Sequence, residues 1–401
     1  MDAETVHDEI EHVRPVHGVK PALAALATGT FAIGTTEFGT MSILQPLADS
    51  LHLSVEQAST TISSYAMGVV VGAPVLAVTG AKLSRKTMVV LLICLFVVGN
   101  LGTVLCATLP SIEILRFITG LPHGAFFGIA ALIAASLVDY SHRGRAIGFV
   151  FTGIMISTVI GAPSFTVLSQ YVSWHFIYIL IASVGVICIA SMLYFVPKDA
   201  PHPGANPMTE LKALFIPQVW FTFFTGAIGF AGLFGVYTFL TSALSEVTHL
   251  NHWAISLYQV VCGLGLVAGN AFGSAMVDRN LDKTVIYALI ASIFFMLGFW
   301  LTLPYQWLVL PFCFLIPAGC IIISPALQTR LMDVAGDAQT LAAALNQSAF
   351  NCANALGPWF AAQLIDAGFG FHAVGWGGAI LSAGGLVIYL VALAVKKRVP
   401  A

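Results

Sequence analysis

Charged residues are scarce in this 401-residue chain, and that scarcity excludes most classes of soluble protein. Asp, Glu, Lys and Arg make up 8% of the sequence, whereas an average soluble domain contains about 25%. A disordered chain is excluded as well, because disorder requires high charge and low hydrophobicity. The formal net charge of −2 gives no basic surface, so we expect no nucleic-acid partner.

Cysteine motifs are absent too. The seven cysteines lie in or beside apolar stretches, and no two of them form a CxxC pair, so neither a zinc site nor a redox motif is expected. No paired nucleophile and base stands out in the sequence. We therefore expect a protein that is not an enzyme and that holds no metal or other cofactor.

Apolar residues, by contrast, are abundant and occur in long runs. They make up 58% of the chain, and the mean hydropathy is +0.92. A helix needs about 20 apolar residues to cross a bilayer core about 30 Å thick. Runs of this kind lie at approximately 22–45, 57–79, 87–106, 112–137, 146–168, 174–196, 219–244, 254–277, 284–303, 306–327, 340–365 and 373–395. The sequence therefore predicts an all-α polytopic membrane protein with 12 transmembrane helices.

The polar residues at the start of the chain do not form a secretory signal, which requires a positive start and a short apolar core. They are mostly acidic, and the apolar run that follows Pro21 is long enough to remain as a span. His7, His12 and His17 recur among the acids. This spacing is compatible with a metal-binding tail, although a solvated arm is commoner at a chain terminus.

The basic residues outside the spans predict the orientation of the protein. With 12 spans, every Lys and Arg of the loops and tails falls on one side, and the opposite loops contain none. The positive-inside rule then places both termini and the central loop in the cytoplasm. The predicted divisions are a tail at 1–20, a bundle at 21–196, a loop at 197–218, a bundle at 219–395 and a tail at 396–401.

The two predicted bundles repeat each other weakly at an offset near 197 residues. Gly68 and Gly72 of the second span correspond to Gly265 and Gly269 of the eighth. Two similar six-helix halves, with the substrate site between them near the midplane, are typical of secondary transporters.

Two charged residues within the predicted spans are the main candidates for function. Glu37 lies far from both ends of the first span, and Arg116 is the sole basic residue inside a span. Charges at membrane depth are costly and normally face a partner or a wet cavity. We expect Glu37 and Arg116 to couple transport to protons, together with His123, which lies on nearly the same helix face as Arg116. The alternatives are a fixed structural ion pair, a local pair between Arg116 and Glu113, and an interior hydrogen-bonded histidine.

Neutral polar residues form a stripe in the eleventh predicted span. Asn346, Gln347, Asn351 and Asn354 fall within an arc of roughly 140° on a helix. Such a stripe can line a cavity and bind a polar solute, or it can serve interhelical hydrogen bonding alone. We expect Thr36, Tyr65, Phe127 and Tyr237 to line the same cavity.

These features resemble the major facilitator superfamily, and more narrowly the arabinose-efflux-permease-like branch of its twelve-span drug:proton antiporters. The resemblance covers nearly all of residues 21–395. It rests on Gly34-Thr-Thr-Glu37-Phe, on Tyr65-Ala-Met-Gly68-Val-Val-Val-Gly72-Ala-Pro74, on His123-Gly-Ala-Phe-Phe-Gly128 and on the stretch from Ala344 to Gly357. It implies a monomer of two pseudo-symmetric six-helix bundles in a bacterial inner membrane, and an export substrate among sugars, nucleosides, phenicol-like drugs and other small amphiphiles.

The gating motifs of the superfamily fit this sequence unevenly. The span-4 motif carries over as Arg116 and Gly120, with Gly124 four residues further on. The span-5 motif keeps Gly161 and Pro163 but lacks the glycines that usually follow. The loop after the second span retains Lys82 and Arg85, and its copy after the eighth span retains Asp278 and Arg279. The resemblance implies that these residues gate or shape the transport path.

The sequence as a whole predicts a transporter that exports a small solute by alternating access and uses the proton gradient as its energy source. A facilitator or a proton-symporting importer on the same fold is the nearer alternative. A non-transporting receptor or membrane enzyme is a more distant one, because no sensory domain or catalytic cluster is found.

Overall fold

The computed structural model describes residues 18–53, 55–80, 82–161, 164–165, 168–169, 171–199, 207–336 and 338–398. These residues are mostly helical and contain no strand. Pro163 and the three tail histidines lie outside the described residues. The predicted all-α class is confirmed.

The first bundle comprises the helices up to α8. They are α1 (Val19–Ser42), α2 (Leu44–Ser50), α3 (Val55–Thr79), α4 (Arg85–Val104), α5 (Leu109–Ser136), the short η1 (Tyr140–His142), α6 (Arg143–Ile156), the π-helical η2 (Ser157–Gly161) and α8 (Trp174–Phe195). We call this set the N-terminal bundle. Its α6 and η2 together form one membrane-length segment.

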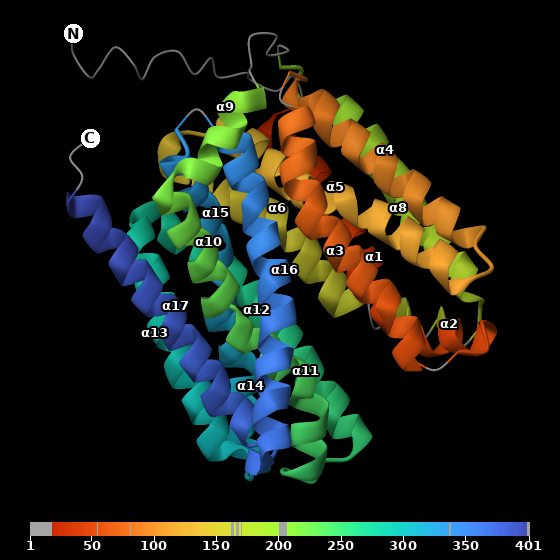
Figure 1. Cartoon of the computed structure of the whole chain (residues 1–401), viewed down its shortest axis with the longest axis vertical. Coiled ribbons are helices and arrows are strands. Elements are labelled where there is room, and N and C mark those ends of the chain that lie inside the picture. The colour runs from red at the N-terminus through yellow and green to blue at the C-terminus, as the bar shows by residue number, and fades with distance from the viewer. Residues whose placement is uncertain are drawn as a thin grey trace.

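The second bundle begins after the central loop. It comprises α10 (Pro217–Gly229), α11 (Ala231–Glu246), α12 (His252–Arg279), α13 (Leu281–Thr302), α14 (Gln306–Ile321), α15 (Ile323–Val334), α16 (Gln339–Leu364), the π-helical η4 (Ile365–Phe369) and α17 (Ala373–Arg398). We call this set the C-terminal bundle. In Figure 1 the two bundles stand as separate lobes that meet along α3, α5 and α16.

Nine helical segments of the described chain are long and apolar enough to cross a membrane by composition alone. The other three predicted spans are α1, α3 and α16, which contain 24, 25 and 26 residues. They are more polar because they carry Glu37, several hydroxyl residues and the Asn/Gln stripe. Polar helices of this kind are tolerated where they face the interior of a bundle.

The predicted repeat is also present in the packing. Gly68 and Gly72 of α3 lie against the backbone of Phe117 and Leu121 in α5. Gly265 and Gly269 of α12 lie in the same way against the backbone of Phe314 and Ala318 in α14. Each contacted residue of the second pair is 197 positions after its counterpart, so the offset read from the sequence reappears as equivalent helix contacts.

The central loop is partly helical, a feature that its prolines concealed. Short helices α9 (Pro207–Leu211) and η3 (Lys212–Phe215) pack against α16, and α9 also contacts α3. The Glu210 carboxylate accepts a hydrogen bond of 2.9 Å from the backbone N–H of Leu341. An acid in this position satisfies one of the free N–H groups of the first turn of α16.

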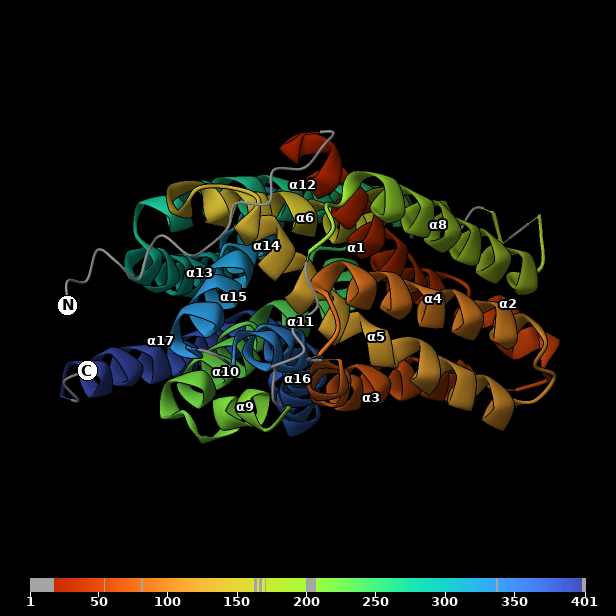
Figure 2. The same ribbon diagram turned by 90° about the horizontal axis from the view of Figure 1, so that it is seen from above.

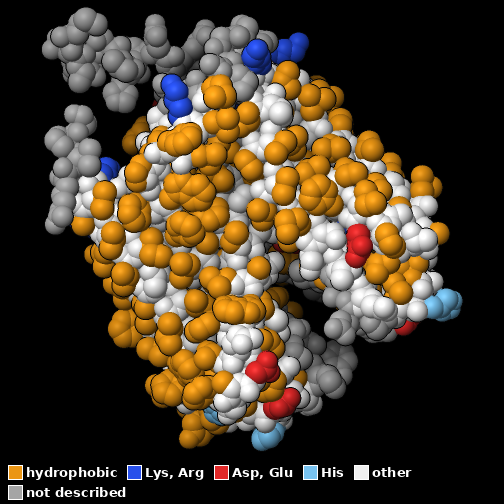
Figure 3. Space-filling model, in the orientation of Figure 1, with side chains coloured by type: hydrophobic (Ala, Val, Ile, Leu, Met, Phe, Trp, Pro, Cys, Tyr) orange, Lys and Arg blue, Asp and Glu red, His pale blue; other side chains and the backbone are white. Residues whose placement is uncertain are grey.

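The two faces of the molecule differ in how the bundles meet. We call the face that holds the start of α1 and the end of α17 the terminal face. Here α6 lies beside α12 (Figure 2), and the backbone of Gly148 accepts a hydrogen bond of 2.8 Å from Asn270. At the opposite face the surface is hollowed between the bundles, whereas Lys and Arg gather near the termini (Figure 3).

Candidate functional site

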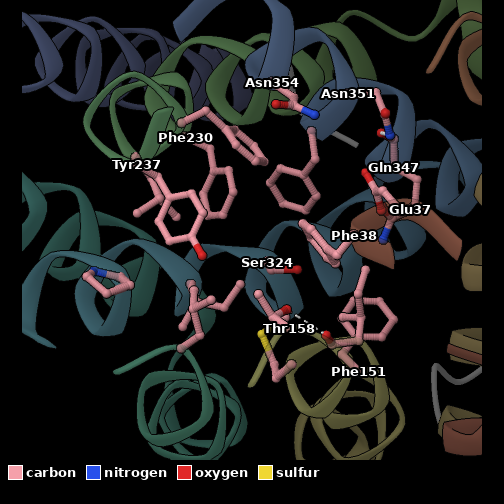
Figure 4. Close-up of a pocket in the computed structure, with 18 of the residues that line it drawn as sticks. Glu37, Phe38, Phe151, Thr158, Phe230, Tyr237, Ser324, Gln347, Asn351 and Asn354 are labelled. Atoms are coloured by element: carbon pink, nitrogen blue, oxygen red, sulfur yellow. Dashed lines mark hydrogen bonds between the residues drawn. The ribbon is translucent and has the colours of Figure 1, made fainter. Parts of the chain in front are cut away.

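A pocket of about 850 Å³, including its open mouth, lies between the two bundles. Helices α1, α5 and α6 supply its wall on one side, and α11, α14 and α16 supply most of the other. Figure 4 shows acidic, amide and aromatic side chains converging on this space. The pocket lies between the two bundles, and secondary transporters bind substrate between two such halves.

Glu37 is part of the pocket wall. Its side chain is partly exposed, and among the described residues no Lys, Arg or His lies within 4.0 Å of its carboxylate. The charge of Arg116 nevertheless acts on it from behind the wall. A carboxylate that is held by no ion pair can gain and lose a proton without breaking one.

Arg116 does not face the pocket. Its side chain is 1% exposed, and its Nη1 donates to the Thr36 hydroxyl at 3.0 Å. The guanidinium also lies 4.3 Å from the centre of the Tyr65 ring. The Thr36 hydroxyl in turn donates to Asn100 at 2.7 Å. The predicted cavity residues Thr36 and Tyr65 therefore lie one layer behind the wall, because they hold Arg116.

The alternative pairing of Arg116 with Glu113 is not found. The Glu113 carboxylate accepts a hydrogen bond from the Thr60 hydroxyl of α3 instead. Glu113 and Arg116 are three residues apart, but the guanidinium is turned inward to α1. Arg116 is thus an interior cation, as expected for a functional charge at membrane depth.

His123 lines the pocket and is 1% exposed. Its Nδ1 is 3.1 Å from the Tyr65 hydroxyl. Among the described residues no atom forms a hydrogen bond with its Nε2, although the Gln347 side chain is near. Tyr65 therefore bridges two predicted site residues, since its ring contacts Arg116 and its hydroxyl contacts His123.

Three members of the predicted polar stripe reach the pocket. Gln347, Asn351 and Asn354 line it, whereas Asn346 does not. The Asn346 amide nitrogen instead lies 3.5 Å from the backbone oxygen of Ser324 in α15. One residue along a helix turns the side chain by about 100°, which is enough to move Asn346 off the wall.

Aromatic residues make up much of the remaining wall. Phe127 and Tyr237 line it as predicted, and the lining residues that the sequence did not reveal include Phe38, Phe151, Phe230, Phe234 and Phe350. A Phe that faces a pocket and a Phe that faces lipid look alike in sequence. The sequence indicated only Phe234, because the repeat makes it the equivalent of Glu37 in the second bundle.

The predicted gating residues fall into two groups. Asp278 of α12 crosses to the N-terminal bundle, where its carboxylate accepts from the Gly144 N–H at 2.7 Å and pairs with Arg145 at 3.4 Å. Beside it, Arg143 pairs with Asp333 of α15 at 2.7 Å. These contacts join the bundles at the terminal face.

The other described gating residues form no hydrogen bond or ion pair between the bundles, although Gly124 also faces the backbone of Ala344 in α16. Lys82 and Arg279 are exposed, and the Arg85 backbone N–H donates to Asp199 at 2.6 Å. Gly120 lies against α3 at Tyr65 and Gly68, Gly124 lies against Ala73, and Gly161 has room for a methyl group.

Neutralising Asp278 is expected to loosen the terminal face. Asp278→Asn removes a charged acceptor, and a hydrogen bond to a charged group contributes about 1.5–3 kcal/mol. A cysteine placed at Ser274, which is 3% exposed and packs against Gly148, should then react with a maleimide about tenfold faster or more. The rate is measured on otherwise cysteine-free protein.

The matched control is Asp366→Asn, which neutralises an exposed acid at the opposite face. It should leave the labelling rate at Ser274 unchanged. Equal rates with and without the Asp278 charge would show that this contact does not hold the bundles together.

Comparison with known proteins agrees with this geometry. A family model described as Major Facilitator Superfamily matches residues 26–348. The inner membrane transport protein YdhP of Escherichia coli K12 is 31% identical over 376 residues, which cover 94% of this chain and 96% of that protein. The putative transporter AraJ of the same organism is 29% identical, covering 91% and 93% of the two chains.

The fold is shared with a solved transporter as well. The crystal structure of the proton:xylose symporter XylE superposes with a TM-score of 0.74 at 14% identity, covering 95% of this chain and 96% of that one. At this identity the likeness concerns the fold alone.

Proposed function

Because the chain belongs to the major facilitator superfamily, we propose that this secondary transporter is a proton-coupled exporter of a small solute. The observation that carries the proposal is the position of Glu37: in the described part of the chain this acid has no ion-pair partner, and it lies in the wall of a pocket shared by both bundles. The proposal includes a bacterial inner membrane, cytoplasmic termini and function as a monomer.

The proton gradient is sufficient for such export. One proton that enters under about 100 mV and one pH unit supplies roughly 3.7 kcal/mol. This free energy sustains a gradient of several hundredfold for a neutral solute. No bound cofactor is required in this scheme, since the gradient itself drives the cycle.

The pocket supports antiport because proton and solute would share one space. A solute in the pocket would lie against Glu37 and exclude water from its carboxylate. When the solute leaves, water reaches the carboxylate again and can protonate it. Cytoplasmic termini, which the proposal includes, would make this the outward-open state, in which solute leaves and a proton arrives. Asp278 and the pair between Arg143 and Asp333 then hold the cytoplasmic side closed.

Proteoliposomes distinguish this proposal from its alternatives. With a panel of sugars, nucleosides and small amphiphiles, an exporter discharges an acid-inside pH gradient in inverted vesicles when its substrate is added. A facilitator gives counterflow that does not depend on an imposed pH gradient. A symporter moves protons in the same direction as its solute, and that result would overturn the proposal.

Orientation is tested by labelling single cysteines in intact cells. The exposed positions at the open face are Asp49, Ser173 and His249, and those at the terminal face are Lys82, Lys212 and Lys396. An impermeant maleimide should label the first set and spare the second. Lys86 is unsuitable, because it is 9% exposed and its ammonium group donates to backbone oxygens of α8 and its C-cap.

Labelling of both sets from outside would contradict the predicted topology. Labelling of the second set alone would invert it, and the pocket would then open to the cytoplasm. Permeabilised cells provide the control, since all six positions should react there.

A further inference from the structure

We propose that the substrate of this pocket is a neutral amphiphile whose polar end both accepts and donates a hydrogen bond and whose apolar end carries an aromatic ring. This inference rests on the proposed function, in that the pocket is taken as the transport site. It favours one substrate class over organic cations and free sugars.

The first observation concerns His123 of the N-terminal bundle. No carboxylate pairs with this buried ring in the described structure, so it is neutral. A phenol is a stronger donor than an imidazole N–H, and an imidazole nitrogen is the stronger acceptor. Tyr65 therefore donates to Nδ1 at 3.1 Å, and the hydrogen of the ring lies on Nε2. Among the described residues no atom accepts from this N–H within 3.5 Å, although the side chain of Gln347 lies near it.

The second observation concerns Asn351 of the C-terminal bundle, which is 7% exposed and lines the pocket. Its Nδ2 donates to the backbone oxygen of Gln347 at 3.0 Å. Because that carbonyl can only accept, the orientation of the amide is fixed, and Oδ1 is the atom without a partner. A buried polar atom without a partner is costly, so its presence in a binding pocket points to a ligand that satisfies it.

The two unpaired atoms have complementary hydrogen-bonding roles. His123 offers a donor from one bundle, and Asn351 offers an acceptor from the other. A ligand group that contains both an acceptor and a donor, such as a secondary amide or a hydroxyl, satisfies both atoms. Such a ligand would contact both bundles. The space between the two halves is where secondary transporters bind their substrates.

The aromatic wall determines the rest of the ligand. Phe230 lies 4.7 Å from Phe350 and 5.4 Å from Phe234, measured between ring centres, and all three line the pocket. A free sugar presents hydroxyl groups on every side, and those that face these rings would remain unpaired. An aromatic ring instead finds partners of its own kind at favourable distances.

The charge of the pocket disfavours an organic cation. Glu37 supplies one negative charge at the wall, and the buried Arg116 supplies one positive charge that acts on it. The pair is neutral when Glu37 is ionised and positive when Glu37 holds a proton. A cationic ligand therefore gains less attraction from ionised Glu37 than it would without Arg116, and it is repelled by Arg116 when Glu37 holds a proton.

The test is direct binding to the purified full-length protein without any gradient. The probe is N-benzoylphenylalaninol, a neutral molecule with two rings, an amide and a hydroxyl. Its matched amine, N-benzylphenylalaninol, lacks the carbonyl oxygen and is charged at neutral pH. We expect the amide to bind about tenfold tighter than the amine, and glucose not to compete. Methylation of the amide nitrogen and the hydroxyl should weaken binding about fivefold.

Variants separate the two contacts. His123→Phe keeps a ring but removes the donor and should weaken amide binding about tenfold, whereas His123→Gln keeps a donor and should bind within about threefold of the wild type. Asn351→Leu should weaken binding, while Asn346→Leu, on the same helix but off the pocket, should not. The ligand analogues test the same contacts in unaltered protein, so a variant that fails to fold does not block the test.

Several results would overturn the inference. An amine that binds as tightly as the amide would make this a cation site. A methylated probe of unchanged affinity would remove the role of Asn351, and a His123→Phe variant of unchanged affinity would remove that of His123. No binding by the amide, in a protein that exports another solute against a pH gradient, would overturn the substrate class and leave the proposed function intact. Amide binding without any proton-driven transport would leave the substrate class standing and overturn the proton coupling.

Discussion

Glu37→Gln is expected to abolish proton-driven uphill transport while substrate exchange continues. Gln has nearly the same shape as Glu and resembles its protonated form, so the pocket and the fold are retained. Exchange needs no net proton movement, and it survives when the site cannot ionise. Net export requires the acid to release a proton in each cycle, and the variant has none to release.

The measurement combines two assays on the same proteoliposomes. Counterflow of labelled substrate should stay within about threefold of the wild-type rate, because the lost interaction is of the order of one hydrogen bond. Substrate-induced proton movement, followed with a pH-sensitive dye, should fall to the level of empty liposomes. Glu113→Gln is the matched control, since Glu113 is an acid of the same bundle that does not line the pocket.

Normal coupling in Glu37→Gln would refute the role of Glu37. Protons would then have to pass through another titratable group, such as His123 at the pocket or Asp139 just before η1. Loss of both exchange and coupling in a well-folded variant would instead place Glu37 in substrate binding alone.

The functional residues that could be predicted from the sequence are the charged residues within apolar membrane spans. Glu37 and Arg116 stand out because a charge inside an apolar run is costly. The direction of each side chain could not be predicted, because it depends on how a helix is rotated within its bundle. Arg116 turns toward Thr36 and away from the pocket, and Asn346 faces α15 while its neighbour Gln347 lines the pocket.

The aromatic wall illustrates a second limit of the sequence. Phe38 and Phe350 line the pocket, yet Phe is equally suited to contact lipid or a neighbouring helix. Only tertiary structure distinguishes these surroundings. Similarly, the prolines of the central loop indicated an irregular connection, whereas Glu210 is buried there against the start of α16.

The repeat of small residues was the most reliable guide to the fold, because it reports on backbone distance directly. Glycines four apart allow two membrane helices to approach until their backbones touch. Gly72 and Gly269 do this in equivalent helix pairs. The weak sequence repeat therefore corresponds to contacts that each bundle needs in order to form.

The largest loss of folded protein is accordingly expected from Gly72→Val and Gly269→Val. A Cβ atom at either position would overlap backbone atoms, of Leu121 in the first case and of Ala318 in the second. Backbone in a helix cannot move aside as a flexible side chain can, so the helices must separate. Overpacking usually costs about 1–3 kcal/mol of folding free energy. We expect a loss at or above the upper end of this range, because the branched Val side chain would meet rigid helix backbone.

The two variants should behave alike, because the repeat gives them equivalent contacts in different bundles. Size-exclusion profiles of detergent-solubilised protein should lose most of the monodisperse peak for both, and the remaining protein should unfold at a lower temperature. Gly161→Ala is the control: its nearest neighbour is the Thr35 hydroxyl at 3.5 Å, so an added methyl group makes an ordinary contact. A stable Gly72→Val variant together with an unstable Gly269→Val variant would contradict the expectation. The two glycines would then share a sequence spacing but contribute differently to the stability of their bundles.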